Sequence, residues 1–93
     1  MTDTARETGV ALIARYIAPH PANPGRDEYW LPAYGYSVWV IAGDLSPDAA
    51  NAAVVAREYG IPLEAVEAVE AVWAYYCRHR ALIDNRLAQN RVV

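Results

Sequence analysis

Few residues in this chain of 93 have the types and spacing that catalysis or metal binding requires. Cys77 and His79 lie two residues apart in a helical pattern, where they cannot share a face, so they do not form a zinc pair. His20 lies in a proline-rich segment with no neighbouring ligand in sequence. Ser37 and Ser46 are the only serines, and both suit helix caps better than nucleophiles. We therefore expect a protein that is not an enzyme and that needs no metal or cofactor.

The charged residues limit which kinds of partner the protein can bind. The chain has eight Arg, no Lys and eleven acidic residues, for a net charge of −3. This balance opposes binding of nucleic acid or an anionic membrane over the whole surface, although local basic patches remain open. Cys77 has no partner for a disulfide, and its helical setting favours a small buried side chain. The longest strongly apolar run, residues 38–42, is too short to cross a bilayer, and we expect a cytoplasmic protein.

Basic side chains gather towards the C-terminus, namely Arg78, His79, Arg80, Arg86 and Arg91. Cations are favoured at the end of a helix, so one interpretation is a solvated face in which Arg80 pairs with Asp84. The other is a patch that contacts phosphate or a partner protein, with Arg78 and Arg86 among its contacts.

Aromatic residues are the second group that could bind a partner. The chain has three Trp and seven Tyr but no Phe, so Trp39, Trp73, Tyr75 and Tyr76 are the natural core. Other aromatic residues crowd a turn-rich stretch between residues 29 and 36. They either complete the core or act as exposed interface anchors, which often carry binding energy.

Local patterns predict the elements that position these side chains. Residues 4–18 have the spacing of an amphipathic helix, and the prolines that follow end it and form a connector to residue 27. Residues 28–31 are expected to be extended, because Pro32 biases Leu31 away from helix. Residues 37–42 suit either a strand or a short helix capped by Ser37, and we favour the helix.

A third helix is predicted from Ser46 to about Tyr59. Ser46 can cap it, Pro47 fits its first position, and Asp48 favours the positive end of its dipole. Gly60 then provides a left-handed exit.

The strongest pattern is a single helix over residues 62–90. Apolar residues recur at alternating spacings of three and four: Val66, Val69, Trp73, Tyr76, Ile83 and Leu87. Such a helix would be roughly 40 Å long, which exceeds the rest of so small a domain. The stripe therefore either forms a coiled-coil seam with a second copy or lies across its own domain. We predict a partner or dimer interface through Trp73, Tyr76, Arg80, Ile83 and Leu87.

Two helices joined near Gly60 form a helix-turn-helix-like corner, which invites a DNA-binding hypothesis. The second helix begins with Glu64, Glu67 and Glu70, however, and carboxylates repel phosphates and lack the donors that read guanine. A DNA-binding autoregulator would therefore use other cations: Arg6, Arg15 and Arg26.

From Tyr34 onward the chain resembles the DUF433 family of small bacterial proteins. The similar segments are residues 34–41 (YGYSVWVI), 56–62 (AREYGIP), 64–66 (EAV), 74–80 (AYYCRHR) and 83–87 (IDNRL). Arg15-Tyr16-Ile17, His20-Pro21 and Pro24-Gly25 resemble the longer members. One departure is the three-residue repeat over Glu64–Val72, which adds about three residues before the tyrosine pair.

The resemblance implies a helix-turn-helix-like fold, frequent homodimers and a role as the antitoxin of a toxin–antitoxin pair that sequesters a PIN-like ribonuclease. The alternatives are the DNA-binding autoregulator and a dimeric scaffold. We predict one mainly α domain with a helix-turn-helix-like core, three-helical or winged-helix-like, and a short N-terminal extended segment. Residues 1–27 form its N-terminal helix and connector, residues 28–61 its core, and residues 62–90 its long C-terminal helix.

Overall fold

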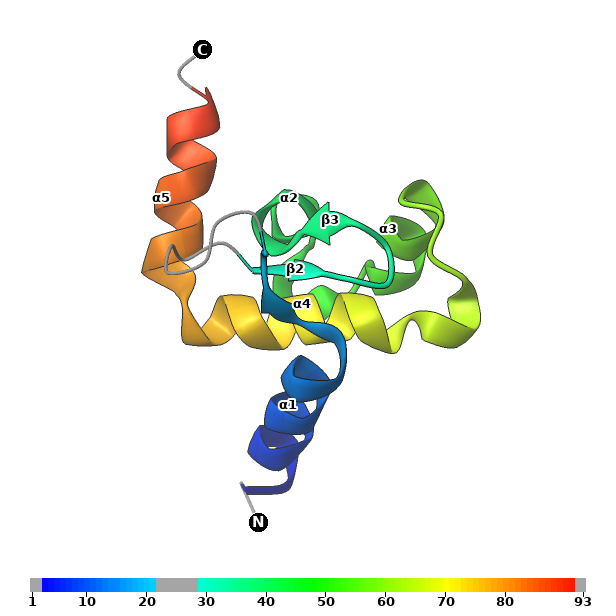
Figure 1. The fold of residues 1–93 in the computed structure, drawn as a ribbon. Helices are drawn as coiled ribbons and strands as arrows, with labels where there is room; N and C mark the ends of the chain where they lie inside the picture. The colour runs from blue at the N-terminus through cyan, green and yellow to red at the C-terminus, as the bar shows by residue number, and fades with distance from the viewer. Residues whose placement is uncertain (1–2, 22–28, 92–93) are drawn as a thin grey trace.

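The computed structural model describes residues 3–21 and 29–91, and they form a mainly helical domain with a small sheet. Figure 1 shows α4 running through the middle, with α1 on one side and the sheet, α2 and α3 on the other. In chain order the elements are α1 (Asp3–Tyr16), β1 (Ala18–Pro19), β2 (Tyr29–Leu31), β3 (Tyr36–Ser37), α2 (Val38–Ala42), the 3₁₀ helix η1 (Pro47–Ala49), α3 (Ala52–Glu58), the 3₁₀ helix η2 (Leu63–Ala65), α4 (Glu67–Arg78) and α5 (Arg80–Arg91).

The three short strands form an antiparallel sheet in the order β1-β2-β3. Trp30 pairs with Ala18 on one side and with Ser37 on the other. The extended segment predicted over residues 28–31 is confirmed for Tyr29–Leu31, while Glu28 lies outside the described residues. A tight turn connects β2 to β3, with Gly35 at φ 80° donating its N–H to the Leu31 carbonyl.

The core lies where α4 meets α2, α3 and the sheet. Its fully buried side chains come from several elements: Leu31, Val38, Ile41, Val55, Val69 and Val72. Ala68 and Ala71 of α4 are also fully buried. Their small side chains let neighbouring backbones approach this central helix on more than one side. Residues 38–42 form a helix, as favoured, although the Ser37 side chain makes no capping hydrogen bond.

The predicted helix start at Ser46-Pro47-Asp48 is wrong. Asp48 and Ala49 have positive φ, so the short element η1 is a left-handed turn and not the first turn of α3, which begins only at Ala52. The Ser46 Oγ instead accepts the N–H of Asn51 and donates to the Asn51 side chain. Asn51 also donates to the carbonyl of Asp44, which fixes the loop before α3.

The predicted exit at Gly60 is confirmed. Gly60 has φ 70°, and its N–H donates to the carbonyl of Arg57 while the Ile61 N–H donates to that of Ala56. This is the Schellman arrangement that commonly ends helices. The chain then makes η2, a short 3₁₀ helix that ends before α4 begins at Glu67.

The single helix predicted over residues 62–90 is also wrong. It is divided into η2, α4 and α5, and the main break is at His79, whose φ of −132° and ψ of 39° are not helical. No Gly or Pro marks the break. It turns α5 steeply away from the axis of α4, as Figure 1 shows, so that α5 packs on α2 and buries Ile83. Packing of an apolar face therefore overrides the local preference for a continuous helix.

Within the described residues, no helix is both long enough and apolar enough to cross a membrane.

Candidate partner-binding pocket

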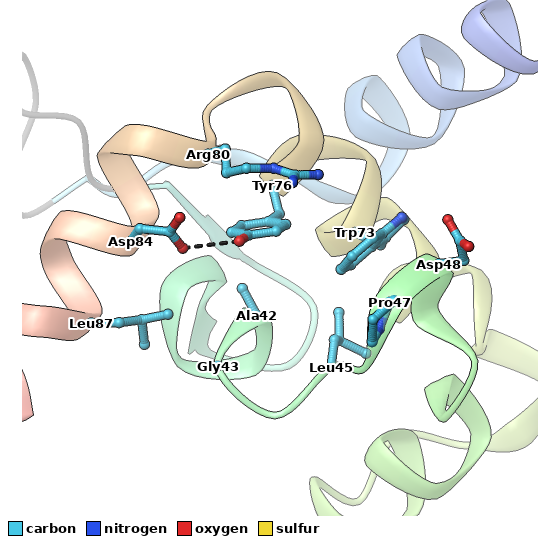
Figure 2. Close-up of a pocket in the computed structure, with 10 residues that line it drawn as sticks. All are labelled: Ala42, Gly43, Leu45, Pro47, Asp48, Trp73, Tyr76, Arg80, Asp84 and Leu87. Carbon is cyan, nitrogen blue, oxygen red and sulfur yellow. Dashed lines mark hydrogen bonds between the residues drawn. The ribbon is translucent and has the colours of Figure 1, made fainter.

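An open pocket of about 420 Å³ lies where the loop between α2 and α3 faces the junction of α4 and α5. Figure 2 shows its lining, with Tyr76 and Trp73 on one wall and the loop opposite. The lining residues are Ala42, Gly43, Leu45, Pro47, Asp48, Trp73, Tyr76, Arg80, Asp84 and Leu87. The pocket therefore combines apolar, aromatic and charged groups at one edge of the domain.

Two aromatic rings from α4 form its main wall. The ring centroids of Trp73 and Tyr76 lie 5.3 Å apart with the planes tilted by 40°. The Tyr76 hydroxyl donates a hydrogen bond of 2.9 Å to the Asp84 Oδ1, which joins α4 to α5 across the break. This bond to a carboxylate, together with partial burial, raises the pKa of Tyr76.

Arg80 places a guanidinium at the edge of the pocket. Its Cζ lies 5.2 Å from the centroid of the Tyr76 ring, within the range of a cation–π contact. The predicted pair between Arg80 and Asp84 does not form, and Asp84 accepts the hydrogen bond of the Tyr76 hydroxyl. In the part of the chain that the structure describes, Arg80 forms no salt bridge.

The structure brings most of the predicted interface residues together. Trp73, Tyr76, Arg80 and Leu87 line the pocket, whereas Ile83 is only 3% exposed and belongs to the core. The apolar stripe thus lies across its own domain, which was the second of the two alternatives.

Arg78 and Arg86, which were predicted to contact phosphate or a partner, lie outside the pocket lining. Arg78 donates to the Ala74 carbonyl and lies against Gly9 of α1, where an added Cβ would be 3.0 Å from its Nη1. Arg86 stacks 5.2 Å from the Trp39 ring and does not line the pocket. Arg78, Arg80 and Arg86 therefore do not form one basic patch.

The sequence pattern missed the wall contributed by residues 42–48. The sequence placed Pro47 at the start of a helix, and nothing local indicated that this loop would face Trp73 and Leu87. The approach is close, since an added Cβ on Gly43 would lie 3.0 Å from the Leu87 Cδ2.

Cys77 is exposed, so its predicted burial is wrong. Among the residues that the structure describes, no three His, Cys, Asp or Glu side chains gather as metal ligands. The Glu64, Glu67 and Glu70 side chains are all exposed.

Of the three arginines assigned to DNA binding, only Arg15 has a side chain within the described residues. The Arg15 Nη1 lies 3.9 Å from the Glu67 Oε2, in an exposed pair. The side chain of Arg6 and all of Arg26 lie outside the described residues.

Comparison with known proteins yields no family model that matches this chain, no similar curated protein and no similar solved structure.

Proposed function

We propose that this protein is a non-catalytic partner-binding protein and acts as the antitoxin of a toxin–antitoxin pair by sequestering a PIN-like ribonuclease. The observation that carries this proposal is the pocket at the α4–α5 junction, where an aromatic wall meets the Arg80 guanidinium, which forms no salt bridge with any residue in the described ranges. The resemblance of residues 34–87 to the DUF433 family supplies the class of partner.

Arg80 suits the recognition of an acidic partner. Guanidinium groups bind carboxylates through two parallel hydrogen bonds, and stacking on Tyr76 holds this one in place before binding. A ribonuclease that binds catalytic metal through carboxylates presents such an acidic surface. Complementary charge would speed association and select the partner.

We also propose a helix-turn-helix-like core for this protein. The connection from α3 through Gly60 to α4 has the order of a helix-turn-helix corner. We assign this corner a structural role, because its exposed face over η2 and the start of α4 carries Glu64, Glu67 and Glu70. A homodimer remains a prediction, and the break at His79 removes the argument for it from helix length.

The test is co-expression of the chain with the protein encoded by the neighbouring gene, followed by purification through a tag on that protein. We expect a stoichiometric complex. Arg80→Glu should weaken it about tenfold or more, by reversing a charge that faces acidic groups. The substitution should not harm α5, because a carboxylate is favoured in the first turn of a helix.

Arg57→Glu is the matched control, since Arg57 is exposed on α3 and does not line the pocket. It should leave the affinity unchanged. Failure of the two proteins to associate would contradict the proposed role. In that case a gel shift on the upstream DNA, with affinity falling steeply with salt, would favour the autoregulator, and no shift would leave the scaffold.

A further inference from the structure

We infer that two copies of this chain associate through the outer face of α1, packed antiparallel about a two-fold axis near Ala11. The outer face is formed by Val10, Ala11 and Ala14, on the side of α1 that is turned away from α4. The inference concerns self-association and goes beyond the proposed capture of a toxin, so either one can fail without the other.

Helix α1 is covered on one side only. Figure 1 shows it on the opposite side of α4 from the sheet, α2 and α3. An added Cβ on Gly9 would lie 3.0 Å from the Arg78 Nη1, and the Tyr16 hydroxyl donates a hydrogen bond of 3.4 Å to the Glu67 Oε2. Ile13, which lies between these two contacts in sequence, packs against the core. The inner side of α1 is therefore occupied by α4.

The other side of α1 is apolar as well. Residues 10–14 read Val-Ala-Leu-Ile-Ala, and five successive residues point to every side of a helix. A stretch of helix that is apolar all round is normally buried all round. Here Val10 is 54% exposed, and Ala11 and Ala14 are also exposed. The outer face thus has the composition of a covered surface, and we expect a second molecule to cover it.

The charges at the two ends of the outer face select a second copy as that molecule. In the sequence of α1, Glu7 lies one turn before Ala11 and Arg15 lies one turn after it, on the same side of the helix. Two-fold symmetry packs a surface against itself. Antiparallel packing about Ala11 then brings position 7 of each copy opposite position 15 of the other.

Such a dimer joins an apolar centre to two pairs of opposite charge, one at each end. The Arg15 side chain is 71% exposed and its contact with Glu67 is 3.9 Å long, so it stays accessible to a second copy. Alanine at the axis lets the two helices approach closely. A contact between two single helices is smaller than the standard interface of about 1,600 Å², so we expect a weak dimer with a dissociation constant of about 100 μM.

The experiment is sedimentation equilibrium of the full chain at concentrations from about 10 μM to about 1 mM, where the wild type should show a monomer–dimer equilibrium. Val10→Asp should weaken the dimer about tenfold or more, because it places carboxylates in the apolar centre. Val54→Asp is the matched control, since Val54 is 57% exposed but lies on α3. It should leave the dissociation constant unchanged.

Two charge reversals test the antiparallel pairing. Glu7→Arg and Arg15→Glu each place like charges at both ends of the interface, and each should weaken self-association about tenfold. An equimolar mixture of the two variants should associate as well as the wild type, because every pair again joins opposite charges. Recovery in the mixture also shows that both variants are folded.

Three results would overturn the inference. The first is a wild-type chain that stays monomeric up to about 1 mM. The second is a dimer that Val10→Asp weakens no more than Val54→Asp does. The third is a mixture of the charge variants that associates no better than either variant alone. A toxin that co-purifies with a monomeric chain would leave the proposed function standing, whereas a dimer without a toxin complex would leave only the self-association.

Discussion

Ala49 has a backbone conformation that its own methyl group disfavours. Its φ is 54°, next to Asp48 at φ 59°, and a left-handed conformation costs a residue with a Cβ roughly 1–2 kcal/mol. The strain is held in place by the hydrogen bonds between Ser46 and Asn51 on either side. Because Pro47 and Asp48 line the pocket, this turn sets the shape of one of its walls.

Replacing Ala49 with glycine should therefore stabilise the protein. We expect Ala49→Gly to raise the free energy of unfolding by up to about 1 kcal/mol, since glycine adopts positive φ without strain. Ala53→Gly, in the regular helix α3, should lower it by about 1 kcal/mol. Urea unfolding of both variants measures the difference, and equal losses would contradict a left-handed residue 49.

Tyr59 should make the folded protein less stable at alkaline pH. Burial, followed by the hydrogen bond that its hydroxyl donates to Asp44, raises the pKa of Tyr59 from 10.0 to about 12. The fold thus favours the protonated phenol, so this stabilisation is complete below about pH 10 and is lost as the pH rises through about 12.

The wild type should lose up to about 1 kcal/mol from this residue between about pH 9 and about pH 12, a small amount because solvent screens a half-buried group. Tyr59→Phe should remove that part of the loss. Tyr34→Phe, in the turn between β2 and β3, should retain it. Urea unfolding at the two pH values tests this prediction, and an unchanged alkaline loss in Tyr59→Phe would contradict it.

At the scale of elements, local signals predicted most of the helices and the ends of α1 and α3, but not the start of α3 or the break at His79. Helix α1 follows its apolar spacing and its prolines, and α3 ends at Gly60 because only glycine adopts φ 70° without strain. The break at His79 has no such local cause. It depends on Ile83 and Leu87 reaching α2, which is distant in sequence, and no periodicity within residues 62–90 contains that information.

Adjacent residues of α5 should show this difference. Ile83 is 3% exposed and Leu82 is 37% exposed. We expect Ile83→Ala to lower the free energy of unfolding by about 2–4 kcal/mol and Ile83→Val by about 1 kcal/mol. Leu82→Ala should cost about 0.5 kcal/mol or less.

Chemical unfolding at two protein concentrations measures these values and tests the origin of the loss. An Ile83 that packs within its own chain gives a loss independent of concentration. A loss that varies with concentration would instead place Ile83 in a seam between two copies.

At the scale of the whole molecule, the pocket is a property of the fold and not of any one segment. Four interface residues were predicted from a helical stripe: Trp73, Tyr76, Arg80 and Leu87. They still line one pocket although the helix is broken at His79. The opposite wall, from Ala42 to Asp48, could not be predicted, because it depends on how the α2–α3 loop crosses α4. A charge pattern on one helix also could not show that Asp84 would pair with Tyr76.

The way α5 is attached has a consequence for local unfolding. Among the described residues this helix contacts mainly α2 and the end of α4, through Ile83, Leu87, the Arg86–Trp39 contact and the Tyr76–Asp84 bond. So few attachments let α5 detach as a unit, at a lower free energy than global unfolding, and its amide hydrogens should exchange sooner than those of α4.

A ligand in the pocket would touch both α5 and the α2–α3 loop, and it binds only while α5 is docked. We expect binding to slow exchange throughout α5, including amides beyond Leu87 that the ligand never touches. Hydrogen–deuterium exchange with and without the partner measures this, and protection confined to α4 would mean that the partner does not clamp α5. The break at His79 thus makes α5 a separate unit, and we expect its docking on α2 to be stabilised when the pocket is occupied.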